Sequence, residues 1–279
     1  MTVIAYRRRA AVAVLSLNLA VFSCSNAPGP PQKGTPAFYW SAAKETYAAG
    51  DYSKTIEHLE QLSSSENEYS IRARPWLLVM TSGIARGYMS LADTFEAGAR
   101  ARERDTAIFR RNANNYRTAA SRAALQFAET FAKFQGNKDE NVPLAFSYPA
   151  GSTAQIPALT KVANGMAPPG AELETIQKRS LSRGVLLEAC RAVGAPDDPA
   201  KAQEVFKAAS AQVPRAVFVM AMADSMHQQA QLYSRTKLDD PDKYKIFSTR
   251  ALEALSTIPE SKQTKELKLK IDASFKKAK

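Results

Sequence analysis

A regular spacing of apolar side chains between Phe109 and Phe134 constrains the fold more than any other feature of this sequence. Apolar residues recur there at intervals of three and four, which places them on one face of an α-helix. They are Phe109, Ala113, Tyr116, Ala120, Ala124, Phe127, Phe131 and Phe134. An aromatic face of this kind is typical of a packed core, so we assign it no ligand.

Similar patterns predict helices over most of the remaining chain. They cover residues 38–49, 53–62, 70–99, 171–193, 199–212, 214–233, 244–259 and 261–278. No period-two pattern indicates strands, so we expect an all-α fold. We place Pro75 in the first turn of its helix and expect Gly83 and Gly87, four residues apart, to let another helix approach closely. The sequence Asp-Asp-Pro at 197–199 and at 239–241 predicts a helix cap followed by proline.

Residues 136–170 form the one long irregular segment. Five prolines interrupt it, and it has room for a single short helix near 158–164. Connections of this length are usually functional or disordered. Here Val142, Leu144, Phe146, Tyr148 and Ile156 make it hydrophobic, so we expect it to pack against the helices.

The first 23 residues have the three parts of a secretory signal. Arg7–Arg9 are basic, Ala10–Phe22 are mostly apolar, and Ser23 is a small residue at the end. About 13 apolar residues in a helix reach about 20 Å, which is too short for a hydrocarbon core of about 30 Å. We therefore predict a signal peptide at 1–23, a Pro/Gly-rich extended spacer at 24–36 and a helical domain at 37–279.

Val21, Phe22, Ser23 and Cys24 resemble the lipobox of bacterial lipoproteins. The resemblance implies a diacylglyceryl thioether on Cys24, cleavage before it, and acylation of the new amino terminus, which together anchor a protein to a bilayer. Ser25 after the cysteine implies transfer to the outer membrane, with the protein facing the periplasm. The alternative is that Cys24 is an incidental thiol of an ordinary signal peptide.

Two stretches resemble tetratricopeptide repeats. In the first stretch the matching residues are Tyr39, Ala43, Gly50, Asp51 and Tyr52, and in the second they are Ala254, Leu255 and Pro259. Thr55 and Asn67 depart from the alanine and proline usual in this family. The resemblance implies an α-solenoid of antiparallel helix pairs, interrupted by the loop at 136–170.

The sequence offers little for catalysis or metal binding. His58 and His227 are the only histidines, and His227 with Asp224 gives too few ligands for zinc, so we expect both histidines to be surface or half-buried residues. Glycine-rich phosphate loops, HExxH and GxSxG are missing from the sequence. The carboxylate pairs fall at turns or helix starts, where they complement the helix dipole. We predict a protein that is not an enzyme and needs no cofactor or metal.

Cys190 is the only cysteine besides Cys24. It lies in the apolar helical pattern GVLLEACRAV, where a buried structural thiol is expected. With Cys24 as the lipid attachment point, no partner remains for an intramolecular disulfide.

The net charge is +11, and arginines crowd one helix-turn-helix segment. The candidate patch comprises Arg104, Arg110, Arg111, Arg117 and Arg122. It is either an ordinary solvated face or a docking surface for an anionic partner. Export from the cytoplasm makes nucleic acid an unsuitable partner.

These features favour a membrane-anchored, periplasm-facing helical scaffold that binds a protein or an extended peptide without catalysing a reaction. One alternative is a ligand-binding accessory lipoprotein of a transport system, with the loop at 136–170 folded over an apolar pocket. A cell-wall-associated enzyme is the less favoured alternative. The identity of the partner and the oligomeric state stay open.

Overall fold

The computed structural model describes residues 29, 31–102, 106–134, 138–207 and 211–277. The chain divides into two compact units, Met1–Pro30 and Pro31–Lys279, and every element named below belongs to the second. The predicted signal peptide, with Val21, Phe22 and Ser23 of the lipobox, and Cys24 lie outside the described residues.

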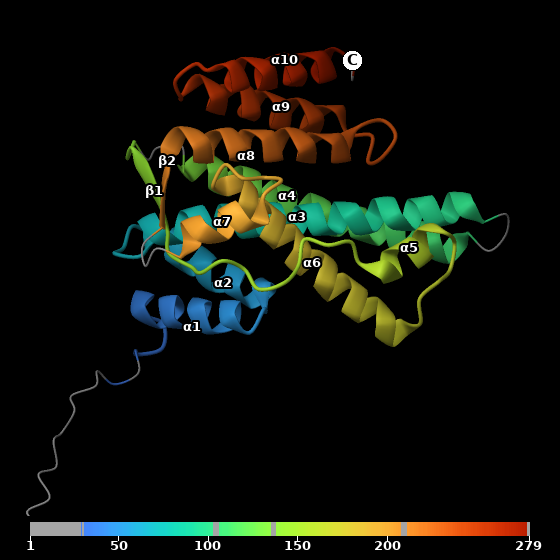
Figure 1. Cartoon of the computed structure of the whole chain (residues 1–279), viewed down its shortest axis with the longest axis horizontal. Coiled ribbons are helices and arrows are strands. Elements are labelled where there is room, and N and C mark those ends of the chain that lie inside the picture. Colours follow the sequence, from blue (N-terminus) through green and yellow to red (C-terminus); the bar gives the residue numbers. More distant parts are fainter. Residues whose placement is uncertain (1–28, 30, 103–105, 135–137, 208–210, 278–279) are drawn as a thin grey trace, which may run out of the picture. The chain divides into compact units, whose positions relative to one another are not determined.

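The second unit is almost entirely helical, as predicted (Figure 1). Its helices are α1 (Pro36–Ala48), α2 (Tyr52–Ser63), α3 (Ser70–Ala101), α4 (Ala107–Phe134), α5 (Pro157–Ala163), α6 (Gly170–Ala192), α7 (Pro199–Phe206), α8 (Arg215–Ala230), α9 (Pro241–Ser256) and α10 (Lys262–Lys277), with a 3-10 turn η1 at Gln231–Tyr233. Among the residues that the structure describes, none of the helices combines the length and apolar character that crossing a bilayer requires.

A two-stranded antiparallel sheet corrects part of the sequence prediction. Strands β1 (Asn141–Leu144) and β2 (Ala211–Pro214) pair with Val142 opposite Val213. The helix predicted over 199–212 therefore ends at Phe206. The two strands lie about 70 residues apart in sequence, so no local turn signals their pairing; burial of alternate side chains on each strand stabilises it instead.

Pro75 is also misplaced by the sequence prediction. It lies in the second turn of α3, where it cannot donate a hydrogen bond to the carbonyl of Ile71. The helix begins at Ser70, as predicted, and the Tyr69 N–H directly before it donates to Asn67 Oδ1 at 2.9 Å. The prolines of the two Asp-Asp-Pro sequences are placed as predicted, since Asp198 and Asp240 cap α7 and α9 directly before them.

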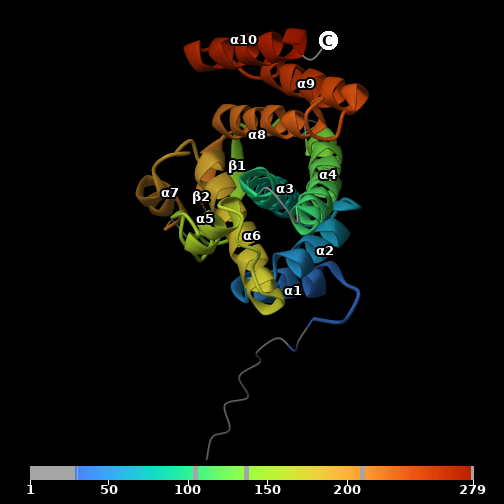
Figure 2. The ribbon, with the colours of Figure 1, turned by 90° about the vertical axis from the view of Figure 1, so that its right-hand side faces the viewer.

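Helix α3 runs through the centre of the unit, with α2, α4, α6 and α8 arranged around it (Figure 2). Residues 75–85 of α3 are all buried, as expected of a helix that is covered on every side. In a solenoid each repeat contacts only its neighbours, whereas α3 contacts α6 and α8, which come much later in the chain. The all-α class is confirmed, and the solenoid arrangement is not.

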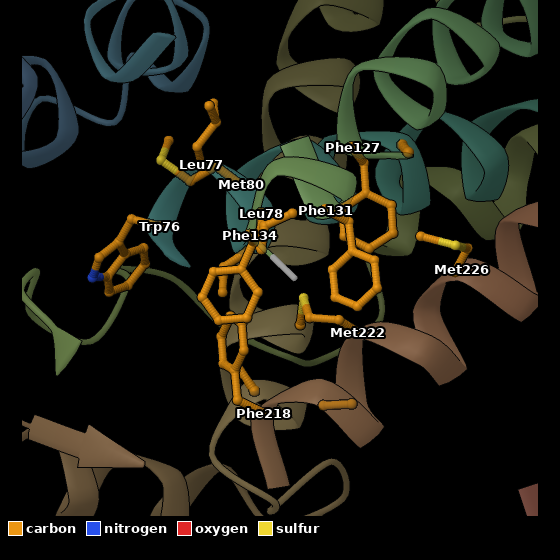
Figure 3. Packing of buried hydrophobic residues seen from close by; sticks show 14 of the residues in the cluster. Trp76, Leu77, Leu78, Met80, Phe127, Phe131, Phe134, Phe218, Met222 and Met226 are labelled. Atoms are coloured by element: carbon orange, nitrogen blue, oxygen red, sulfur yellow. The ribbon is translucent and has the colours of Figure 1, made fainter. Parts of the chain in front are cut away.

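The aromatic face of α4 forms the middle of the core. Phe127, Phe131 and Phe134 face Phe218 and Met222 of α8 (Figure 3). The rings of Phe134 and Phe218 lie 5.3 Å apart between centroids. This packing confirms the prediction that the stripe is core. Helices α8, α9 and α10 then stack in sequence order on the outer side (Figure 1).

The irregular segment packs against the helices, as its hydrophobic residues predict. Phe146 inserts among Trp40, Tyr47 and Trp76, with ring centroids 5.3, 4.9 and 5.2 Å away. The hydroxyl of Tyr47 donates to the carbonyl of Ser147 at 2.6 Å. These contacts fix the loop beside α1 and α3.

Helices α3 and α6 cross in backbone contact at glycines. A Cβ on Gly83 would lie 2.5 Å from the Cα of Val185, and one on Gly87 would lie 2.8 Å from the carbonyl oxygen of Ser180. A Cβ on Gly184 would overlap the carbonyl oxygen of Gly83. Gly83 and Gly87 thus allow the close helix approach that their spacing predicts, and α6 is the helix that approaches.

Candidate functional site

Three adjoining cavities that share lining residues wind around α6, and we call them together the α6 groove. The first, of about 730 Å³, lies between α3, α5 and α6. The second, of about 510 Å³, lies between α6, the α1–α2 turn and residues 150–156, and Ile156 and Arg183 line both the first and the second. The third, of about 340 Å³, continues along α6 and shares Tyr52, Lys178 and Ser182 with the second.

The first cavity stands over a buried ion cluster. Glu188, whose side chain is 2 % exposed, accepts a hydrogen bond from Arg86 at 2.8 Å. It also accepts hydrogen bonds from the hydroxyls of Ser82, at 3.2 Å, and Ser225. A buried carboxylate needs such partners, because leaving it unpaired in the interior is costly. Glu188 therefore holds Arg86 at the cavity wall.

The cluster extends from α6 to α8. Arg191 donates to Asp224 Oδ2 at 2.7 Å, and Lys270 of α10 lies 3.8 Å from the other oxygen of Asp224. Gln229 donates to Ser82 at 2.9 Å. Side chains of α3, α6, α8 and α10 are thereby joined in one polar network next to the apolar core.

Arg183 is the second cation at the first cavity. Its Nε donates to the carbonyl of Thr153 at 2.8 Å, which ties α6 to the irregular segment. Burial, and then the charge of Arg86, lower the pKa of the Arg183 guanidinium. Within the described ranges no acidic side chain forms an ion pair with it.

The second cavity is basic and aromatic. Lys178, Arg179 and Arg183 line it together with Tyr47 and Tyr52, and its lining includes no acidic residue. Burial raises the pKa of both tyrosines, so their hydroxyls are neutral hydrogen-bonding groups at ordinary pH. The groove as a whole offers hydrogen-bond donors and positive charge.

The predicted arginine patch lies elsewhere, on α4. Arg110, Arg111 and Arg122 are exposed, but Arg117 is buried and paired with Glu96 of α3. Arg104 lies outside the described residues. Because Arg117 is already neutralised by an internal acid, it adds no free charge to the surface of α4.

The two histidines differ in burial, and neither belongs to a metal-ligating cluster of the described residues. His227 is 3 % exposed, and burial lowers its pKa, so the expected surface or half-buried position is wrong for it. The reason is that α8 is covered by the core on one side and by α9 and α10 on the other. His58 is half-buried beside Tyr39, as predicted. In the part of the chain that the structure describes, no three metal-ligating side chains come together.

Cys190 is fully buried, as predicted, and lies 3.3 Å from the hydroxyl of Tyr148. Burial raises the pKa of the thiol. A protonated thiol in this position packs as a small apolar group and is a poor nucleophile.

No protein-family model, curated protein or solved structure matches this chain.

Sequence reasoning missed the residues that shape the groove, namely Arg86, Ser180, Arg183 and Glu188. One signal was available: Glu188 is an acid inside the apolar pattern GVLLEACRAV, and an acid in such a position requires a buried partner.

We predict that Glu188→Gln lowers the free energy of unfolding by about 2 kcal/mol. Loss of one partner from a fully buried pair costs about 3–5 kcal/mol, and the cost is smaller here because the side chain of Arg86 is 34 % exposed. Glu204→Gln, which breaks the exposed pair with Lys207, is the matched control and leaves stability unchanged. Urea unfolding followed by circular dichroism measures the unfolding free energy of both variants. Equal effects of the two variants would contradict the role of Glu188 as a stabilising buried ion-pair partner.

Proposed function

We propose that this protein is a lipid-anchored envelope scaffold that binds an extended peptide, or an extended segment of a partner protein, in the α6 groove. In this proposal it faces the periplasm, is attached to the outer membrane through Cys24, and catalyses no reaction. The observation that carries the proposal is the continuity of three open cavities along α6, each of which shares lining residues with the next.

The length and polarity of the groove suit a short extended chain. The α6 residues that line it run from Glu174 to Leu187, a distance of about 20 Å at about 1.5 Å per residue. An extended peptide covers that distance with about six residues at about 3.3 Å each. Its unpaired backbone groups would meet the hydroxyls and guanidinium groups of the lining, which supports a peptide over a compact apolar ligand.

The attachment part of the proposal comes from the lipobox resemblance and the segment after Cys24. Four prolines and two glycines at 25–36 favour an extended spacer between the lipid and α1, which begins at Pro36. A spacer of this composition separates the groove from the bilayer surface and leaves it accessible to a partner.

A ligand-binding accessory of a transport system is the second candidate. The observation in its favour is that residues 150–156 of the irregular segment line the second cavity, and that Ile156 also lines the first. A loop in this position can cover a small molecule. Lys178, Arg179 and Arg183 also line the second cavity, so it is not the purely apolar pocket expected for this candidate, which is why we rank it second.

Photo-crosslinking tests the proposed partner. With benzoylphenylalanine in place of Ser182, which lines both the second and third cavities, we expect a protein adduct after irradiation of the native cells. The control places the same group at Leu269 on α10, which is 69 % exposed and lies outside the groove. Equal adducts at both positions, or none at Ser182, would contradict peptide binding in the groove; a small-molecule adduct at Ser182 would favour the second candidate.

The lipid anchor is tested with the only two cysteines of the chain. We predict that Cys24→Ser abolishes incorporation of radioactive palmitate and moves the protein from the membrane to the soluble fraction. Cys190→Ser, the matched control, keeps both the label and the membrane location, since Cys190 is buried. Unlabelled wild-type protein would rule out lipidation at Cys24.

A further inference from the structure

The first cavity holds two guanidinium groups but has an internal counter-ion for only one of them. Arg86 is paired with Glu188 at 2.8 Å. Arg183 lies close enough for the charge of Arg86 to lower its pKa, and its Nε donates to the neutral carbonyl of Thr153. Arg183 is therefore a half-buried cation that has no ion-pair partner among the described residues.

The two acidic residues of the cavity wall, Asp93 and Asp197, form no ion pair with Arg183. Asp93 is held by Lys237, whose Nζ lies 2.7 and 2.9 Å from its two carboxylate oxygens. Asp197 is exposed, and its carboxylate forms no ion pair within the described ranges. An anion that reached Arg183 would gain attraction without displacing an internal acid.

Ser180 provides an independent sign of a missing ligand group. It lines the same cavity and is 4 % exposed, and its hydroxyl has no hydrogen-bond partner among the described residues. A buried hydroxyl without a partner is unusual and costs about 1–3 kcal/mol. A ligand oxygen bound at Arg183 could accept its proton.

The remaining wall of the cavity is partly apolar, although Ser90 and Thr94 also belong to it. Met89, Leu159 and Leu187 line it together with Ile156, and the volume of about 730 Å³ lies within the range of small-molecule sites. A ligand that fills the cavity would therefore carry a hydrocarbon portion next to its anionic group.

We infer that the first cavity of the α6 groove is a carboxylate-binding site, in which Arg183 and Ser180 bind the carboxylate and the apolar wall takes the adjoining hydrocarbon. A carboxylate fits because its planar oxygens match a guanidinium fork. A phosphate monoester carries more negative charge, so Asp197 of the cavity wall would repel it more strongly. The inference rests on the proposed function and specifies its ligand: the carboxylate belongs to a peptide or to a free carboxylic acid.

Calorimetric titration of the full chain in detergent tests the inference with matched probes. The probes are hexanoate, hexanamide and hexyl phosphate, together with acetyl-tetra-alanine as the free acid and as the amide. We expect hexanoate to bind at least tenfold more tightly than hexanamide and hexyl phosphate. Tighter binding of the peptide acid than of hexanoate would identify a chain-terminal carboxylate as the source, and the reverse would identify a free acid.

Variants link the binding to the cavity. Arg183→Gln is expected to weaken hexanoate binding at least tenfold and Ser180→Ala about threefold. The control Arg111→Gln removes the same charge from an exposed position on α4, outside the groove, so binding stays within twofold of wild type. Circular dichroism shows whether the Arg183→Gln variant is folded. If it is not, hexanoate binding by the Ser180→Ala variant alone tests whether this cavity is the binding site.

The inference is overturned if hexanoate does not bind, if hexanamide binds equally well, or if the folded Arg183 or Ser180 variant binds hexanoate like wild type. A crosslinked partner at Ser182 together with no hexanoate binding would overturn the carboxylate site and leave the proposed function intact. If neither a crosslinked partner at Ser182 nor hexanoate binding is observed, the proposed function and the carboxylate site are both overturned.

Discussion

The structure depends on one backbone contact, the crossing of α3 and α6 at Gly83, Gly87 and Gly184. Side chains larger than hydrogen at these positions would separate the two helices. The crossing also determines which charged side chains meet beside it. Arg86 follows Gly83 by three residues and Glu188 follows Gly184 by four, so the close approach brings the two charges together at 2.8 Å and shapes the floor of the groove.

An apolar cluster and a buried polar network meet at this crossing. On one side of α3, the aromatic residues of α4 pack against α8 in a continuous apolar cluster. Next to this cluster, Glu188, Arg191 and Asp224 form a polar network with hydroxyls and amides of α3 and α8. Such networks contribute little net stability compared with apolar packing, and in some proteins they select one arrangement of the helices. Here the network specifies which faces of α6 and α8 turn toward α3.

The groove follows from the same arrangement. Because α6 approaches α3 so closely at Gly184, its earlier turns extend beyond α3 toward the α1–α2 turn, and residues 150–156 lie beside them. The irregular segment is held there by Phe146 in the aromatic cluster and by Thr153 on Arg183. The cavities are therefore bounded by elements that are distant in sequence, as ligand sites often are.

The helices could be predicted from the sequence because their signals are local. The spacing from Phe109 to Phe134 gives α4, and Asp198 and Asp240 before proline give the starts of α7 and α9. The pairing of Val142 with Val213 could not be predicted, since its stabilisation comes from contacts between distant segments. The spacing of Gly83 and Gly87 predicts a close helix contact but carries no information about which helix makes it.

For the candidate site, sequence reasoning identified arginines as candidate binding residues but did not predict which arginines lie close together in the fold. The arginines of α4 stand out by number, yet Arg117 turns inward to Glu96. Arg86 and Arg183 are separated by almost a hundred residues, and each looks like an ordinary surface cation in its own helix. They become a site only through the α3–α6 crossing, which is a property of the tertiary structure.

The unfolding free energy of Gly184→Ala, compared with Gly170→Ala in the same helix, tests the central claim most directly. Helix propensity alone favours alanine by about 1 kcal/mol at Gly184, in the helix interior, and by less at Gly170, the first residue of α6. A Cβ at Gly170 meets nothing within 4 Å, whereas one at Gly184 overlaps the backbone of α3. We predict that Gly184→Ala loses at least about 2 kcal/mol while Gly170→Ala keeps or gains stability; equal or greater stability of Gly184→Ala would contradict the account.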